Sequence, residues 1–240
     1  MKKYITAALA ASLMLTTVYA DKASDLLDSY LTDTKAPYQF TDMANTEWAA
    51  PSVEMLTALG IVNGFEDGTF RPDNNITKAE FVKIVISAFG LYTPDAAVTL
   101  TDNNPEDWYY TYVSSALEKE IATTDENGTF NAEENITREE MFEISKKAIV
   151  FAEISLTNAT APIVFADEAD INPEYKESID FMSAHGIVAG NPDGTLNPKG
   201  NSTRAEACVM LTRMLNSALE NEKQVFENLT NPVNTEVEAQ

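Results

Sequence analysis

The chain contains three copies of one block of sequence, and an internal repeat constrains a fold more strongly than local propensity does. The first landmark of the block reads Phe40-Thr41-Asp42, Leu100-Thr101-Asp102 and Phe165-Ala166-Asp167, and the second reads Asp67-Gly68-Thr69-Phe70, Asn127-Gly128-Thr129-Phe130 and Asp193-Gly194-Thr195-Leu196. The third, nine residues beyond each glycine, reads Thr77-Lys78-Ala79-Glu80, Thr137-Arg138-Glu139-Glu140 and Thr203-Arg204-Ala205-Glu206. Because the landmarks keep their spacing to within one residue, the chain is predicted to fold as three similar units.

Each unit is predicted to be a helix, a turn-rich loop and a second helix. In the first copy, Ala49, Val53 and Leu56 are spaced by four and three residues, which places them on one face of a helix. Gly60 ends this helix, because glycine readily adopts the positive φ of a C-cap. The Thr-x-x-Glu pattern that follows is a capping box, in which the two residues satisfy each other's backbone N–H groups. The apolar stripes of the second helices are Phe81, Val82, Val85 and Phe89, then Met141, Ile144, Ala148 and Ile149, and then Cys208, Leu211 and Leu215.

The three units are predicted to share one core, because a lone helix pair cannot bury its apolar stripe. Closure around a pseudo-threefold axis suits three copies better than a stacked array does. The expected fold is therefore an all-α bundle of three helix-loop-helix repeats, at residues 40–92, 100–150 and 165–216. Residues 21–39 form an N-terminal segment, and residues 217–240 form an acidic C-terminal tail.

Residues 1–20 are predicted to be a signal peptide. Lys2 and Lys3 supply a positive start, and a mostly apolar, charge-free stretch runs to Val18-Tyr19-Ala20. This stretch is shorter than the about 20 apolar residues that span a bilayer. We therefore expect cleavage after Ala20, secretion, and no membrane insertion afterwards.

The composition and the rare residue types limit the partners, cross-links and cofactors that are expected. The 38 Asp and Glu residues oppose 16 Lys and Arg residues, and the formal net charge of −22 makes nucleic acid an unexpected partner. The single cysteine, Cys208, excludes an internal disulfide, and its apolar neighbours indicate burial. The single histidine, His185, is interpreted as structural. No cofactor or metal is expected, because the loop from Thr123 to Glu134 imitates a calcium loop but begins with Thr instead of Asp.

The repeats resemble the S-layer homology (SLH) family in the order of their motifs: F-x-D, an aromatic residue, G-I-x-x-G, D-G-T-F-x-P and I-T-R-A-E. The resemblance covers about residues 40–216 and is close throughout the third copy. The first copy has Lys78 where Arg is usual, and the second has Glu120-Ile121-Ala122-Thr123-Thr124 in place of the paired glycines. The resemblance implies a three-pronged helical bundle whose grooves between repeats bind a secondary cell-wall polymer, often one that carries pyruvate-ketal sugars.

The resemblance also implies a glycan-binding site, which uses the basic residue of the T-R-A-E motif, the Asp of F-x-D and groove aromatics. Carried onto this chain, these residues are Lys78, Arg138 and Arg204, then Asp42, Asp102 and Asp167, with Trp48 and Trp108. For the two tryptophans, stacking on a sugar ring and burial of the indole in the repeat junction are equally open interpretations.

The basic residues have a physical meaning of their own. A cation in the first turn of a helix lies at the positive end of the macrodipole, at a cost of about 0.3 to 1 kcal/mol, yet all three copies place one there. A ligand carboxylate, bound by the cation and by exposed helix N–H groups, would compensate. The alternative is a salt bridge to a neighbouring acid. Lys78 lacks the planar two-pronged grip of Arg, so its groove is expected to bind weakly or not at all.

The sequence predicts a secreted, non-enzymatic module that attaches non-covalently to an anionic cell-wall polysaccharide. It would lie at the cell wall or cell surface, facing the periplasm if the envelope has two membranes. The alternative is a structural surface-layer or envelope protein that associates with itself or with other surface-layer proteins, which the departures of repeat 2 and Lys78 favour. A wall hydrolase is disfavoured, because the repeats leave no room for a catalytic domain and no phosphate loop or nucleophile elbow is present.

Overall fold

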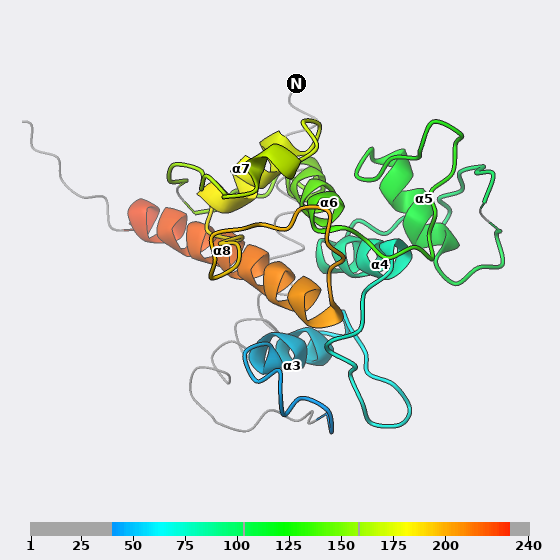
Figure 1. Cartoon of the computed structure of the whole chain (residues 1–240), viewed down its shortest axis with the longest axis horizontal. Coiled ribbons are helices and arrows are strands. Elements are labelled where there is room, and N and C mark those ends of the chain that lie inside the picture. Colours follow the sequence, from blue (N-terminus) through cyan, green and yellow to red (C-terminus); the bar gives the residue numbers. More distant parts are fainter. Residues whose placement is uncertain (1–39, 103, 158, 231–240) are drawn as a thin grey trace, which may run out of the picture.

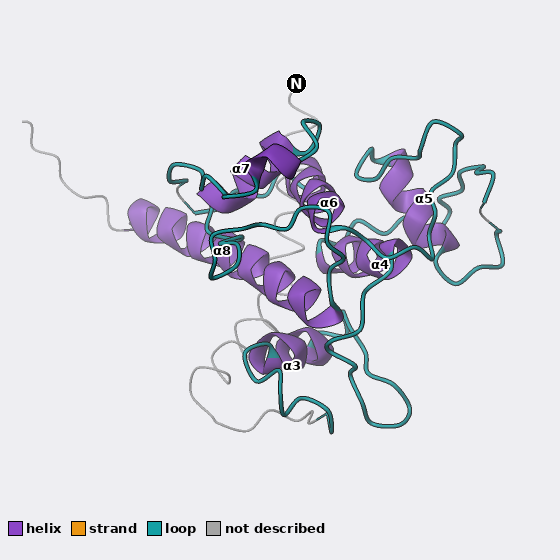
Figure 2. Ribbon diagram, viewed as in Figure 1, coloured by secondary structure: helices purple, strands orange, loops and turns teal. Residues whose placement is uncertain are grey.

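A computed structural model describes residues 40–102, 104–157 and 159–230 of the chain. The helices are α3 (Ala50–Ala58), α4 (Lys78–Ala88), α5 (Tyr110–Glu118), α6 (Arg138–Phe151), the short 3-10 helix η2 (Glu168–Asp170), α7 (Lys176–Ala184) and α8 (Arg204–Thr230). Within these described ranges the ribbon has helices and loops and no strand, so the predicted all-α class is confirmed (Figures 1 and 2). The predicted signal peptide and N-terminal segment lie outside the described residues.

The repeats pack as a closed ring of helix pairs. Each repeat contributes a first helix (α3, α5 or α7) and a second helix (α4, α6 or α8). The first helix of one repeat packs on the second helix of the repeat before it, so that α5 contacts α4 and α7 contacts α6. Helix α3 contacts α8, which closes the ring between the first repeat and the third (Figure 1). The predicted pseudo-threefold closure is therefore present.

Backbone hydrogen bonds form a closed triangle at the centre of this ring. The N–H of Ile76 donates to the carbonyl oxygen of Ser202 at 3.0 Å, Ser202 donates to Ile136 at 3.1 Å, and Ile136 donates back to Ile76 at 3.0 Å. All three residues are buried, at the position just before each capping box. Because buried backbone groups need partners, each repeat here satisfies its neighbour and depends on it.

The second helices begin by bonding across the repeat boundaries. The N–H groups of Lys78 and Ala79 donate to the carbonyl oxygens of Glu134 and Ala132, both at 2.9 Å. The equivalent pairs are Arg138 to Gly200, Glu139 to Pro198, Arg204 to Asn74 and Ala205 to Pro72. The predicted capping boxes of Thr77 and Thr137 are confirmed, and Thr203 exchanges the same pair of bonds with Glu206. The helix starts therefore have their donors satisfied inside the protein.

The Asp of each F-x-D motif binds the turn that precedes the second helix. The carboxylate of Asp42 accepts hydrogen bonds from the N–H groups of Phe70 at 2.8 Å and Arg71 at 2.7 Å. Asp102 holds Phe130 and Asn131 in the same way, and Asp167 holds Leu196 and Asn197. The second residue of each pair has a left-handed backbone, with φ of 58°, 58° and 56° for Arg71, Asn131 and Asn197. Non-glycine residues rarely adopt this conformation, so the Asp fixes a turn that the local chain would not choose.

One of the two missing glycines of repeat 2 is matched by a second substitution in the same repeat. A Cβ atom added to Gly64 would lie 2.1 Å from the Phe40 ring, and one added to Gly190 would lie 2.7 Å from the Phe165 ring. Repeat 2 has Thr124 at the glycine position and, in place of the Phe, the smaller Leu100. The two departures are therefore matched, because the smaller Leu100 removes the ring that a side chain would meet. A Cβ at Gly64 would also lie 2.8 Å from the backbone oxygen of Thr69, so the backbone of repeat 2 must accommodate Thr124 as well.

Helix α8 is longer than the predicted third repeat. It continues past residue 216, where we expected the repeat to end, and reaches Thr230, so the first part of the predicted acidic tail is helical. The physical reason is that no Gly or Pro interrupts the sequence between Gly200 and Pro232. Figure 1 shows its final turns projecting away from the other helices. Residues 231–240 lie outside the described part.

The predicted core positions are buried. Val53, Leu56, Phe81, Val85, Met141, Ile149, Cys208 and Leu211 have relative exposures of 1% or less, whereas Leu215 is partly buried. His185 packs on the Phe181 ring, and its Nδ1 lies 2.7 Å from the carbonyl oxygen of Thr157, which is a structural role as expected. Across the described residues, no helix is both long enough and apolar enough to cross a membrane.

We expect Leu100→Phe to destabilise the protein, because its ring would meet the side chain of Thr124 as Phe40 would meet a Cβ at Gly64. Overpacking of a core typically costs about 1 to 3 kcal/mol. The double variant Leu100→Phe/Thr124→Gly should recover most of that loss. Urea unfolding of the Leu100→Phe, Thr124→Gly and double variants measures the coupling free energy between the two positions. Additive effects of the two substitutions would show that the two departures are independent.

Burial raises the pKa of the Cys208 thiol to about 12, so the folded protein should hold it as an unreactive thiol. We expect a thiol-specific chromogenic reagent at pH 8 to leave Cys208 unmodified in the native protein and to modify it after denaturation, since an unfolded thiol ionises near about 8.5. By linkage, stability should also fall as the pH rises above the unfolded value toward 12. Rapid modification of the native protein would contradict this burial.

Candidate functional site

Three ion pairs connect the repeats in the same cyclic order. Lys78 Nζ lies 3.0 Å from Glu140, Arg138 Nη1 lies 3.0 Å from Glu206, and Arg204 Nη1 lies 3.4 Å from Glu80. Each carboxylate is the capping-box Glu of the next repeat around the ring. The three cationic side chains are largely buried, with side-chain exposures of 17%, 13% and 13%. Each Glu therefore caps its own helix and neutralises the cation of a neighbouring repeat.

The two arginines also bond to the turns that the F-x-D residues hold. Nε of Arg204 donates to the carbonyl oxygen of Phe70 at 3.0 Å, and Nε of Arg138 donates to that of Leu196 at 2.8 Å. The N–H groups of the same two residues are bound by Asp42 and by the Asp of repeat 3. Hydrogen bonds thus connect the F-x-D motif and the turn of one repeat to the T-R-A-E arginine of a neighbouring repeat. Lys78 instead contacts two carboxylates, at 3.0 Å and 3.6 Å.

These contacts show what compensates the helix-start cations within the protein. The expectation of exposed N–H groups at the helix starts is wrong, because carbonyl oxygens of neighbouring repeats already accept from them. The alternative, a salt bridge to a neighbouring acid, is present in all three repeats. The glutamate offsets the unfavourable position of the cation near the helix macrodipole.

Two cavities lie between repeats and contain two of the three cations. Groove A, of about 260 Å³, is lined by loop residues 61–65 and Phe70 of repeat 1, by Glu80 and Lys83 of α4, by Trp108 of repeat 2 and by Arg204 of repeat 3. Groove B, of about 170 Å³, is lined by loop residues 121–125 and 129–131 of repeat 2, by Glu140, Glu143 and Lys147 of α6, by Tyr175 of repeat 3 and by Lys78 of repeat 1. Each groove therefore needs all three repeats.

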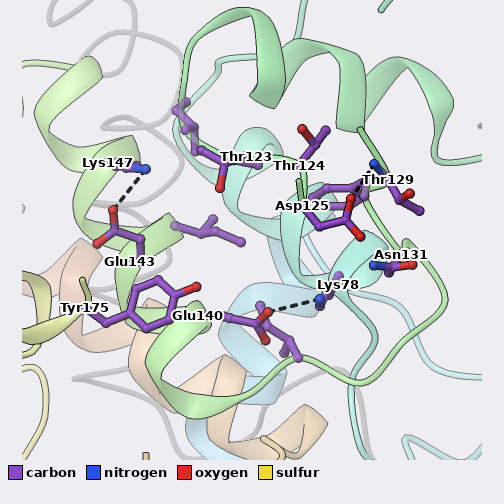
Figure 3. Close-up of a pocket in the computed structure, with 15 residues that line it drawn as sticks. Lys78, Thr123, Thr124, Asp125, Thr129, Asn131, Glu140, Glu143, Lys147 and Tyr175 are labelled. Atoms are coloured by element: carbon purple, nitrogen blue, oxygen red, sulfur yellow. Dashed lines mark hydrogen bonds and ion pairs between the residues drawn. The ribbon is translucent and has the colours of Figure 1, made fainter. Parts of the chain in front are cut away.

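The two grooves are equivalent under the pseudo-threefold symmetry but differ in chemistry. Arg204 of groove A corresponds to Lys78 of groove B, and the aromatic side chain in the lining is Trp108 in groove A and Tyr175 in groove B. The two rings come from neighbouring positions of the repeat, because Tyr175 is the N-cap of α7, whereas the N-cap of α5 is Tyr109. Figure 3 shows groove B, with the Lys147–Glu143 pair on α6 and the Lys78–Glu140 pair below it. Burial raises the pKa of Tyr175 to about 12, with nearby glutamates adding to the shift, so its hydroxyl remains a proton donor at neutral pH.

The structure places the predicted site residues in three different situations. Arg204 and Trp108 line groove A, and Lys78 lines groove B. Arg138 and Trp48 line neither of these two cavities. Trp48 and Trp108 have 58% and 53% of their surface exposed, which supports the accessible interpretation of these rings rather than burial. Asp42, Asp102 and Asp167 also lie outside both cavities, with their carboxylates bonded to backbone N–H groups.

Sequence reasoning missed two residues of groove A. Lys83 lies on α4 three residues after Glu80, so the two side chains share one face of the helix. Phe65 lies in the loop, and the guanidinium carbons of Arg71 and Arg204 lie 3.7 Å and 5.2 Å from its ring centroid. The helical spacing from Glu80 was the available signal for Lys83, whereas nothing local indicated Phe65.

The calcium-like loop of repeat 2 uses its acid for a turn. Asp125 accepts from the N–H groups of Asn127 and Thr129, both at 2.9 Å. The Thr129 hydrogen bond is the largest cause that lowers the pKa of Asp125. Throughout the described ranges, no cluster of three or more His, Cys, Asp or Glu side chains is arranged to hold a metal ion.

Comparison with known proteins identifies the three units. The model of the S-layer homology domain matches residues 39–82, 99–142 and 164–208, which is more than half of the chain. The chain belongs to the S-layer homology family. The matched segments contain the F-x-D, turn and capping-box motifs, so the SLH domains coincide with the repeats seen in the ring.

Curated relatives share the SLH region at low identity. The chain is 27% identical over 178 residues to an endoglucanase of Bacillus sp. (strain KSM-635), covering 74% of the chain and 19% of that protein. It is 26% identical over 171 residues to the surface-layer 125 kDa protein of Lysinibacillus sphaericus, covering 70% and 14%. It is 27% identical over 159 residues to the cellulosome-anchoring protein of Acetivibrio thermocellus, covering 64% and 35%. The chain thus spans only a minor part of each of these longer proteins.

We expect the ion pairs between repeats to stabilise the SLH bundle. Arg138→Met keeps the length of the side chain but leaves Glu206 and the Leu196 carbonyl without their partner, at a cost on the order of 2 kcal/mol. Arg71→Met is the matched control, because its pair with Asp67 is exposed and should contribute less than about 1 kcal/mol. Denaturant unfolding compares the two. Equal losses of unfolding free energy in both variants would show that an ion pair between repeats stabilises the protein no more than an exposed pair does.

Proposed function

We propose that this SLH protein is a cell-surface module that anchors non-covalently to an anionic cell-wall polysaccharide. The observation that carries the proposal is groove A, where an exposed indole, a cation and polar loop atoms from three repeats converge. An exposed aromatic ring offers a face to a sugar, and a cation selects a negatively charged substituent. The relatives named as surface-layer and cellulosome-anchoring proteins support the same setting.

Arg204 retains donors for a ligand although it is held by the protein. A guanidinium has five N–H donors. The bonds of Arg204 to Phe70, Glu80 and Asn63 use one donor each, which leaves two. A sugar carboxylate in groove A would receive these donors while its ring stacks on Trp108. The cavity volume of about 260 Å³ is below the roughly 300 to 1,000 Å³ of drug-sized sites, so we expect it to enclose a short part of the glycan.

The other predicted contacts take lesser roles in this proposal. Lys78 is a weaker contact in groove B, because two carboxylates already surround its ammonium group. Arg138 and Trp48 occupy the corresponding positions at the third junction, where α3 packs on α8. Asp42 and Asp167 contribute by holding the turns to which Arg204 and Arg138 bind, and Asp102 holds the equivalent turn of repeat 2.

On this proposal the protein acts without catalysis, in the cell wall or on the cell surface, and faces the periplasm if the envelope has two membranes. A second candidate function is structural, as a surface-layer or envelope protein that associates with itself or with other surface-layer proteins. Exposed apolar side chains outside the two grooves favour it: Val150, Phe151, Ile163 and Val164. Oligomers that form without glycan would support this second function.

Co-sedimentation with purified cell walls tests the proposal. We expect Trp108→Ala to weaken binding by about tenfold, because it removes an exposed ring that contributes about 1 kcal/mol or more to stacking. Phe151→Ala is the matched control, since it removes an aromatic ring that is 48% exposed and outside both cavities. Unchanged sedimentation of Trp108→Ala, or equal loss in both variants, would count against the groove as the binding site.

A further inference from the structure

We propose that the two grooves differ in charge selectivity, and that Lys83 makes groove A the one that takes an acidic sugar. This inference rests on the proposed glycan binding and goes beyond it, because it assigns the charge selectivity to one groove and to one side chain. It starts from the charged residues that line each cavity. Groove A is lined by two cations, Lys83 and Arg204, and one carboxylate, Glu80. Groove B is lined by the cations Lys78 and Lys147 and the carboxylates Asp125, Glu140 and Glu143.

Ion pairing leaves one charged side chain without an ion-pair partner in each groove, and these two side chains have opposite signs. In groove A, Glu80 pairs with Arg204, and the ammonium group of Lys83 is left. In groove B, the glutamates pair with Lys78 and Lys147, and the carboxylate of Asp125 is left. Groove A therefore presents a spare cation to a ligand, and groove B presents a spare anion.

Lys83 has no carboxylate to neutralise it in the described part of the chain, where no acidic oxygen lies within 4.0 Å of its Nζ. Its Nζ instead lies 5.7 Å from the centroid of the Trp108 ring. This position is unusual in a protein with 38 acidic and 16 basic residues. A lysine beside an exposed ring, inside a cavity, suits a ligand that has both a sugar face and a negative charge.

The walls of the two grooves differ in the same direction. In groove A, the Phe65 ring lies beside the guanidinium group of Arg204, and both residues belong to the lining of the cavity. The residue of groove B equivalent to Phe65 is Asp125, and Glu143 occupies the position of Lys83. An acidic sugar would therefore meet Lys83 and the free donors of Arg204 in groove A, but two carboxylates in groove B. Repulsion of this kind excludes a wrong ligand as effectively as attraction selects the right one.

The test uses the full chain and titration calorimetry with two probes: a cell-wall polysaccharide that carries pyruvate-ketal groups, and the same polymer after its carboxyl groups are reduced to alcohols. We expect the native protein to bind the acidic polymer at least tenfold more tightly. Lys83→Gln should remove at least tenfold of affinity for the acidic polymer and change binding of the neutral polymer by less than twofold. Lys83→Arg should keep the preference, and Lys83→Glu should reverse it.

Two controls separate this inference from a general effect of charge or folding. Lys147→Gln removes the same charge from groove B and should leave the preference for the acidic polymer within twofold of the native value. Thermal unfolding midpoints of Lys83→Gln and Lys83→Arg should stay close to that of the native protein, since Lys83 has no ion pair to lose and only the contact with the Trp108 ring is affected. The assignment to groove A would be overturned if Lys83→Gln kept the preference for the acidic polymer. It would also be overturned if Lys147→Gln lost as much affinity for that polymer as Lys83→Gln does. Equal binding of both polymers by the native protein would also overturn it while the glycan-binding proposal stands, whereas binding of neither polymer would refute both.

Discussion

The triangle of backbone hydrogen bonds among Ile76, Ser202 and Ile136 is the constraint on which the rest of the structure depends. Its members lie far apart in the sequence, so ordering the chain between them has a large entropic cost that only the complete ring repays. Because each bond joins two different repeats, no pair of repeats can form the triangle. The helix starts, the ion pairs and both grooves are arranged around it.

One kind of residue connects this framework to the cavities. The capping-box glutamates Glu80, Glu140 and Glu206 each receive the backbone N–H of their own Thr and the cation of a neighbouring repeat. The glutamate that starts a helix thus also fixes the position of a basic side chain from another repeat. Side chains held by contacts of this kind have little conformational freedom left to lose, which is the condition that favours tight binding of a ligand.

Much of the fold was predictable because its signals are local. Capping boxes, apolar stripes and turn glycines each follow from a few neighbouring residues, and their threefold recurrence indicated closure. The partners of Arg204 and Asp42 were not predictable, because they lie in distant parts of the chain or in the backbone of another segment. The replacement of a glycine by Thr124 could not be explained from local sequence, because its partner is Leu100, which stands where the first repeat has the Phe40 ring. Lys83 and Trp108 belong to different repeats, so only the packing of α5 on α4 brings them together.

The shared construction of the grooves has a consequence for how the ring would lose its cavities. Every repeat supplies residues to the lining of each cavity, so a proteolytic cut that separates one repeat from the ring removes part of both cavities at once. Both cavities would then be lost together and not one after the other.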